Sequence, residues 1–245
     1  MASPRISFEF FPPQSLDASF NLVETVQALA PMSPEFVSVT YGAGGTTRKL
    51  TQDAVGTIHR NYGLNVAAHL TCVEATRSET LAIAEGYHAA GVRQIVGRAP
   101  GEDAITGTNG LLDNPRFVDG LREVGARGLC FDLQLIPELM KKTAKVLEQS
   151  PTTKIALCHA GSPHDRSPDG IAHWVRQLGF LSCQPQITCK LSGLGMFDHN
   201  WTTENTREIV ATCLKQFGAQ RTMFGSNFPV DKLYSDYSTV IAAYQ

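Results

Sequence analysis

Polar side chains stand at the ends of several short apolar segments of the sequence. Glu9 lies in the phenylalanine-rich run 8–11, where desolvation would raise the pKa of a carboxyl group, as a general acid requires. An ion pair with a neighbouring arginine or lysine explains the same residue equally well. His69 and His159 also end apolar segments, where an imidazole can act as a general base, bind a metal or form a hydrogen bond.

The histidines and cysteines do not follow a metal-binding pattern. A catalytic zinc needs three or four ligands, often with a His-x-His pair on one strand, and Phe8 and Phe10 stand where such a pair would be expected. The six cysteines include no Cys-x-x-Cys pair. We therefore expect no bound catalytic metal and no disulfide. The glycine-rich run 42–45 offers backbone N–H groups to an anion, although an ordinary loop explains it equally well.

A scaffold that gathers strand ends at one place would bring these residues together. Short apolar runs alternate with amphipathic segments of helix length along the whole chain, which is typical of repeated strand–helix units. The predicted strands are residues 6–10, 36–41, 65–73, 92–96, 129–135, 154–159, 187–192 and 222–227. This α/β pattern predicts a closed (β/α)8 TIM barrel with its site at the carboxyl ends of the strands. The alternative is a doubly wound open sheet, which would need a glycine-rich turn after its first strand.

Composition and charge exclude several classes of protein. The chain has 245 residues, of which 42% are hydrophobic and 18% charged, and its formal net charge is −2. This composition suits a buried core, and the length suits one barrel, so we predict one domain over residues 1–245. The dispersed charges indicate no nucleic-acid partner, and no apolar run reaches the ~18–20 residues that span a membrane. Without an apolar leader, we expect a cytoplasmic protein.

Three long motifs occur in the first part of the chain. They are Ile-Ser-Phe-Glu-Phe-Phe-Pro-Pro at 6–13, Phe-Val-Ser-Val-Thr-Tyr-Gly-Ala-Gly-Gly at 36–45 and Ala-Ala-His-Leu-Thr-Cys-Val at 67–73. On these motifs, residues 4–90 resemble the flavin-dependent methylenetetrahydrofolate reductases. The resemblance implies that Glu9 is the acid near the folate nitrogen. It also implies that Thr40, Tyr41 and His69 contact the flavin.

The resemblance to the reductases ends before the flavin site is complete. After strand four the family has an Arg-Gly-Asp turn that holds the flavin, whereas this chain has Val-Gly-Arg-Ala-Pro at 96–100. The later flavin-binding and folate-binding segments are also absent. We therefore expect no bound cofactor and interpret the remaining flavin contacts as vestigial. FAD is the alternative.

The rest of the chain, residues 91–245, carries motifs of a different kind. They are Cys-Phe-Asp-Leu-Gln-Leu at 130–135, Ala-Leu-Cys-His-Ala-Gly at 156–161, Cys-Lys-Leu-Ser-Gly-Leu at 189–194 and Arg-Thr-Met-Phe-Gly-Ser-Asn-Phe-Pro-Val at 221–230. This part resembles the amidohydrolase-related, lactonase-like hydrolases. The resemblance implies that His159 is the substrate or metal residue of strand six. Asn227 falls where many members carry an aspartate that activates water, and an amide cannot act as a general base.

Both families form (β/α)8 barrels, so three strands of one and five of the other add to a complete barrel. The leading hypothesis is an engineered or recombined chimera with no complete inherited active site and little or no catalytic activity. One alternative is a hydrolase or lactonase that uses His159 at the barrel mouth. The other is a reductase-like protein that binds FAD weakly. If the protein is an enzyme, the hydrolase is favoured. The polar barrel mouth is also expected to accept a small anion or metabolite.

Overall fold

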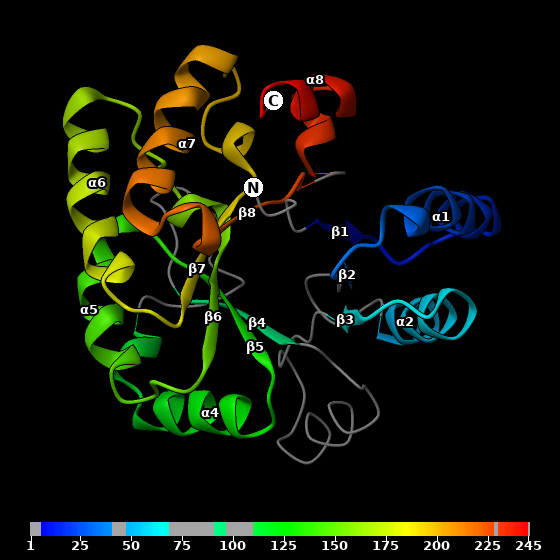
Figure 1. Ribbon diagram of the computed structural model, residues 1–245, viewed down its shortest axis with the longest axis horizontal. Coiled ribbons are helices and arrows are strands. Elements are labelled where there is room, and N and C mark those ends of the chain that lie inside the picture. Colours follow the sequence, from blue (N-terminus) through cyan, green and yellow to red (C-terminus); the bar gives the residue numbers. More distant parts are fainter. Residues whose placement is uncertain (1–5, 41–47, 69–90, 97–109, 228–229, 245) are drawn as a thin grey trace. The chain divides into compact units, whose positions relative to one another are not determined.

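Parallel strands alternate with helices along the chain (Figure 1). The computed structural model describes residues 6–40, 48–68, 91–96, 110–227 and 230–244. The chain divides into two compact units, Met1–Arg93 and Gln94–Gln245, close to the boundary at residue 90 between the two sequence resemblances. A single domain over residues 1–245 stays a prediction.

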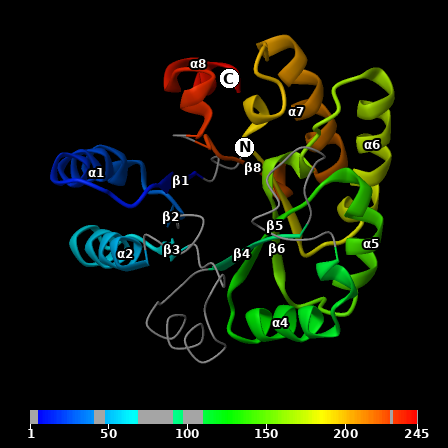
Figure 2. The same cartoon turned by 180° about the vertical axis from the view of Figure 1, so that it is seen from behind.

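The first unit contains a three-stranded sheet and two helices. The strands are β1 (Ser7–Phe10), β2 (Phe36–Val39) and β3 (Val66–Ala68), and they pair in parallel in that order. The helices are α1 (Leu16–Leu29), extended by the 3₁₀ helix η1 (Ala30–Met32), and α2 (Arg48–Tyr62). Both helices lie on the same side of the sheet (Figures 1 and 2).

The register of this sheet determines which side chains face the helices. Phe10 pairs with Val39, and both belong to the apolar core that contains Val26 of α1. Glu9 pairs with Ser38. Because successive side chains of a strand point to opposite faces, Glu9 and Ser38 lie on the face of the sheet away from the helices.

A five-stranded sheet, whose first strand crosses the boundary between the units, organises the second unit. Its strands are β4 (Gly91–Ile95), β5 (Cys130–Gln134), β6 (Lys154–Leu157), β7 (Ile187–Leu191) and β8 (Thr222–Phe224), in that spatial order. Strands β5 to β8 pair in parallel. The helices are α4 (Pro115–Ala126), α5 (Pro137–Leu147), α6 (Pro168–Ser182), α7 (Thr203–Phe217) and α8 (Tyr237–Ala242).

Strands β5 and β7 alternate between buried and partly exposed positions. Their buried residues, such as Leu133 and Ile187, pack with Met140 of α5 and Trp174 of α6 in one apolar core. The intervening polar residues lie on the other face of the sheet and include Asp132, Gln134 and Lys190. The helices therefore stabilise one face and leave the opposite face to polar side chains.

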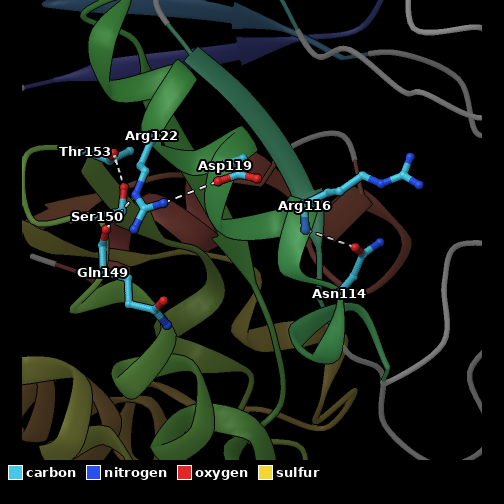
Figure 3. A network of polar contacts seen from close by, with 7 residues as sticks. All are labelled: Asn114, Arg116, Asp119, Arg122, Gln149, Ser150 and Thr153. Atoms are coloured by element: carbon cyan, nitrogen blue, oxygen red, sulfur yellow. Dashed lines mark hydrogen bonds and ion pairs between the residues drawn. The ribbon is translucent and has the colours of Figure 1, made fainter.

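Helix α4 is anchored to the connection between α5 and β6 (Figure 3). Asn114 caps the helix by accepting a hydrogen bond from the Arg116 N–H at 3.1 Å, and Pro115 occupies the first turn, where its missing N–H costs no hydrogen bond. Arg122 Nε donates to the Gln149 carbonyl at 3.1 Å. The Arg122 contact lies near the amino end of β6, so it fixes the scaffold at the end opposite to the predicted site.

Two expectations about membranes and cysteines can be compared with the described residues. No helix among them is both long enough and apolar enough to cross a membrane. The described cysteines are free thiols and comprise Cys130, Cys158, Cys183, Cys189 and Cys213. Cys72 lies outside the described residues.

Candidate functional site

The residues implied by the reductase resemblance fall in the first unit. Glu9 is half-buried in β1. Thr40 follows β2, and both of its backbone polar groups are used by the fold. Its N–H donates to a β1 carbonyl at 2.8 Å, and its carbonyl accepts a hydrogen bond from Thr51 Oγ1 at 3.0 Å. Tyr41 and His69 lie outside the described residues.

The described residues include only part of the implied flavin site. Of the three predicted ring contacts only Thr40 is described, and its backbone polar groups are bonded within the sheet and to α2. A flavin dinucleotide also needs groups that hold its pyrophosphate, and the chain has no Arg-Gly-Asp turn after β4. The chemistry proposed below therefore uses no flavin.

His159 follows β6 within the short turn η4 (Cys158–Gly161). His159 is 2% exposed, and its Nδ1 lies 3.0 Å from Oγ of Ser192, which follows β7. His159 and Ala160 both have left-handed backbone conformations, with φ of 54° and 52°. Trp174 Nε1 stabilises the turn by donating to the Ala160 carbonyl at 2.8 Å. Left-handed residues other than glycine cluster at functional sites.

Asn227 follows β8 and also has a left-handed backbone, with φ of 53°. Its side-chain Nδ2 lies 2.9 Å from Met196 Sδ and donates to Asp231 Oδ1 at 3.2 Å. A β-carbon placed on Gly193, which follows β7, would lie 2.6 Å from His159 Nδ1 and 3.0 Å from Asn227 Nδ2. The polar groups that follow β6 and β8 therefore meet beside Gly193.

Asp231 is the residue that the sequence reasoning missed. It lies in the 3₁₀ helix η7 (Val230–Leu233), and only 4% of the residue is exposed. Burial raises its pKa to about 6, although the hydrogen bond from Asn227 acts in the opposite direction. A carboxyl group with a pKa near the working pH is well suited to general-base catalysis. We call His159, Ser192, Asn227 and Asp231 the β6–β8 cluster.

A second polar pair joins the adjacent strands β5 and β7. Lys190 Nζ lies 3.2 Å from Asp132 Oδ2, and their side chains are 13% and 24% exposed. The neighbouring Cys130 has its pKa raised to about 12, mainly by burial and then by the Asp132 carboxylate. The Cys130 thiol is therefore protonated at neutral pH and is a poor nucleophile.

The described residues do not fit a catalytic metal either. Among them, no group of three histidine, cysteine, aspartate or glutamate side chains is close enough to hold an ion. The neighbours of His159 and Asn227 in the cluster include a hydroxyl, a thioether and a single carboxylate. The chemistry below therefore uses no metal, and the predicted absence of one stays a prediction.

Sequence comparison and structure comparison find different relatives of this chain. Residues 1–114 match the family model of methylenetetrahydrofolate reductase. This match confirms the first resemblance and extends it beyond residue 90. The 5,10-methylenetetrahydrofolate reductase of Pectobacterium carotovorum is 43% identical over 91 residues, which cover 37% of this chain and 30% of that protein.

An uncharacterized protein, y4mH, of Sinorhizobium fredii is 38% identical over 131 residues, which cover 54% of this chain and 44% of that protein. The chain thus spans less than half the length of these curated relatives.

Solved structures support the second resemblance at the level of fold. An amidohydrolase from Burkholderia multivorans with bound zinc has a TM-score of 0.73 and 20% identity, and the match covers 99% of this chain and 90% of that one. A putative 2-pyrone-4,6-dicarboxylic acid hydrolase from Pseudomonas putida has a TM-score of 0.69 and 16% identity, with coverage of 99% and 90%. These likenesses confirm the predicted α/β fold of the TIM-barrel class.

Proposed function

We propose that the second unit hydrolyses a small lactone or ester and that Asp231 activates the water. In this reaction the Asp231 carboxylate accepts a proton while the water oxygen bonds to the substrate carbonyl carbon. The ring C–O bond then breaks, and the leaving oxygen takes up a proton. The observation that carries this proposal is the hydrogen bond from Asn227 Nδ2 to the buried Asp231 carboxylate at 3.2 Å.

The roles of the other cluster residues follow from their chemistry. Asn227 Nδ2 is a donor, so it can hold the carboxylate in place or stabilise negative charge on the reacting oxygen. His159 is the group that returns a proton to the leaving oxygen, and Ser192 Oγ at 3.0 Å orients its ring. The fold shared with a 2-pyrone-4,6-dicarboxylic acid hydrolase supports a lactone as the substrate class and agrees with the expected small anion.

The origin of the chain is a second part of the proposal. The reductase match over residues 1–114 and the hydrolase-like fold support a recombined barrel, whether natural or engineered. The expectation of little or no activity rested on the incomplete flavin site, on the missing metal-binding pair and on Asn227, whose amide cannot activate water. Asp231 removes the last of these three reasons, because it supplies a carboxyl group one helical turn later. A cytoplasmic location stays a prediction.

We expect hydrolysis to depend on His159. The purified protein should hydrolyse at least one member of a panel of sugar lactones and pyrone carboxylates, with kcat/KM above ~10³ M⁻¹s⁻¹, near the lower end of enzymes. His159→Ala should reduce this value by about 10²-fold or more because it removes a proton donor. His59→Ala, on the exposed surface of α2, is the control. Equal rates in all three proteins would contradict the proposed function.

The reductase alternative, which the family match favours, leads to a different expectation. We expect purified protein to lack the yellow absorbance of flavin, because the groups that would hold the pyrophosphate half are absent from the sequence and each 1.4 kcal/mol of lost contact weakens binding tenfold. The measurement is the visible spectrum after reconstitution with excess FAD and gel filtration. Stoichiometric flavin would favour the reductase.

A further inference from the structure

Trp201 ends the connection between the 3₁₀ helix η5 (Leu194–Met196) and helix α7, and its side chain is half-buried. A β-carbon placed on Gly195 would lie 3.0 Å from the indole Nε1 of Trp201 and 3.7 Å from Asp231 Oδ1. The two atoms therefore lie within about 7 Å of each other, a distance that one small molecule spans when each group contacts it at about 3 Å.

The segment that carries Trp201 is held against the turn that carries Asp231. The Trp201 backbone N–H donates to the Asp198 carbonyl at 3.1 Å. The next residue, His199, stacks on Tyr234 with 4.0 Å between ring centroids, and the Tyr234 N–H donates to the Asp231 carbonyl at 3.0 Å. The indole is thus positioned before a substrate binds, as a donor that stabilises developing charge should be.

The indole N–H is a donor that the described part of the chain leaves available. None of the hydrogen bonds among the described residues uses Trp201 Nε1. The Asn227 amide nitrogen, by contrast, donates to Asp231 Oδ1 at 3.2 Å and lies 2.9 Å from Met196 Sδ, so both of its hydrogens have a neighbour. Ester hydrolysis puts negative charge on the carbonyl oxygen, and a further donor is needed to stabilise that charge.

We propose that Trp201 Nε1–H donates a hydrogen bond to the substrate carbonyl oxygen and stabilises the negative charge that forms there. This inference rests on the proposed hydrolysis. As the water oxygen bonds to the carbonyl carbon, Asp231 takes a proton from the water and the C=O electron pair moves to the oxygen. The resulting anion lies beside a neutral Asp231. When the C=O bond forms again, the ring C–O bond breaks and the leaving oxygen takes a proton from His159.

Gly195 contributes to this arrangement through its missing side chain. The edge of the indole that carries the N–H faces the position where a β-carbon would stand, with Nε1 at 3.0 Å and Cδ1 at 3.1 Å. A residue without a β-carbon lets a bound molecule approach the backbone closely. The carbonyl oxygen can therefore reach the indole N–H from the side on which Asp231 lies.

The kinetic test removes the indole N–H and then restores a ring N–H. Trp201→Phe keeps an aromatic ring without a donor, whereas Trp201→His has a five-membered ring whose Nε2, like the indole Nε1, lies two bonds from Cγ. For Trp201→Phe we expect kcat of lactone hydrolysis to fall about 10²–10³-fold, the effect of removing one oxyanion donor. KM should change less than about threefold, because the interaction forms in the transition state.

Trp201→His should recover about tenfold or more of this loss, since it restores a donor. Phe180→Leu, which removes an exposed ring of α6, is the control and should keep the wild-type kcat. An equal loss in Trp201→Phe and Trp201→His, or a change in KM alone, would indicate a packing role and overturn the inference.

A binding measurement separates this inference from the proposed function. The probe is a six-membered cyclic phosphonate, an anion whose tetrahedral phosphorus resembles the hydrolysis intermediate. The comparison is δ-valerolactam, which is neutral and planar and has no ester bond. Both are titrated into protein labelled with ¹⁵N-tryptophan, in which the two tryptophans give separate indole signals. The phosphonate should move the Trp201 proton signal downfield. The Trp174 N–H already donates to the Ala160 carbonyl, so its signal should move much less.

The phosphonate should bind Trp201→Phe about 10²-fold more weakly than wild type, as a transition-state analogue does when a transition-state contact is lost, while lactam binding stays the same. This result supports the inference even if the wild-type protein hydrolyses nothing, which would overturn only the proposed function. The inference is overturned if the wild type does not bind the phosphonate, if the Trp201 signal does not move, or if Trp201→Phe binds the phosphonate as tightly as wild type.

Discussion

Asp231→Asn is expected to lower kcat/KM for hydrolysis by about 10²–10⁴-fold, the usual contribution of general acid–base catalysis. The amide has the same shape and its oxygen can still accept the hydrogen bond from Asn227, but it cannot take a proton. Asp236→Asn is the matched control, because this carboxylate is exposed, caps α8 and can be replaced by another good capping residue. A loss of less than about threefold in Asp231→Asn would show that another group activates the water.

The pH dependence follows from the same carboxyl group. Because the base must be ionised, kcat/KM of the wild type should rise with pH around the Asp231 pKa of about 6. The hydrogen bond from Asn227 lowers this pKa, so Asn227→Ala should move the rise to higher pH. If the pH profile of Asn227→Ala is the same as that of the wild type, Asp231 is not the group whose ionisation controls kcat/KM at low pH.

Asp231 should also reduce stability at neutral pH. Its pKa in the folded protein is raised from 3.8 to about 6, so between these values the folded state keeps a proton that the unfolded state has released. Stability therefore falls as pH rises through this window, by up to about 3 kcal/mol for a shift of this size. Asp231→Asn should be more stable than wild type at pH 8 and similar to it at pH 4 in urea unfolding. An aspartate whose ionised form stabilises the fold would give the opposite result at pH 8.

The sequence predicted the described elements well because their signals are local. The strand predicted over 129–135 is β5, Cys130–Gln134, and the strand predicted over 187–192 is β7, Ile187–Leu191. Buried and polar positions alternate on β5 and β7, because only one face of the sheet packs against helices.

The candidate site was predicted less completely, for a physical reason. Strand ends can be located from sequence, and this placed His159 and Asn227 correctly at the ends of β6 and β8. Asp231 follows a proline and a valine in a short irregular segment, where nothing in the spacing predicts burial. The available signal was its position four residues after Asn227, the separation at which side chains of one helical turn meet. Its raised pKa depends on tertiary packing, which no local pattern contains.

Gly193→Ala is expected to lower kcat/KM by about 10²-fold because the added methyl group would displace the side chains of His159 and Asn227. The added methyl would lie 2.6 Å from His159 Nδ1 and 3.0 Å from both Asn227 Nδ2 and Met196 Sδ. These atoms must move, and displacing catalytic groups by about 1 Å can cost about 10²-fold in rate. Gly193 also has φ of 61°, so alanine adds backbone strain of about 1–2 kcal/mol.

Gly128→Ala separates the two effects. Gly128 has a similar φ of 71°, and a β-carbon there would meet nothing within 4 Å. Both variants should therefore lose about the same stability through backbone strain. Only Gly193→Ala should lose further stability through the close contacts of its methyl group, and only this variant should lose activity. Hydrolysis rates and urea midpoints of the two variants are measured side by side. If Gly128→Ala loses as much activity as Gly193→Ala, general destabilisation explains the loss, and the position beside His159 and Asn227 is not where the reaction takes place.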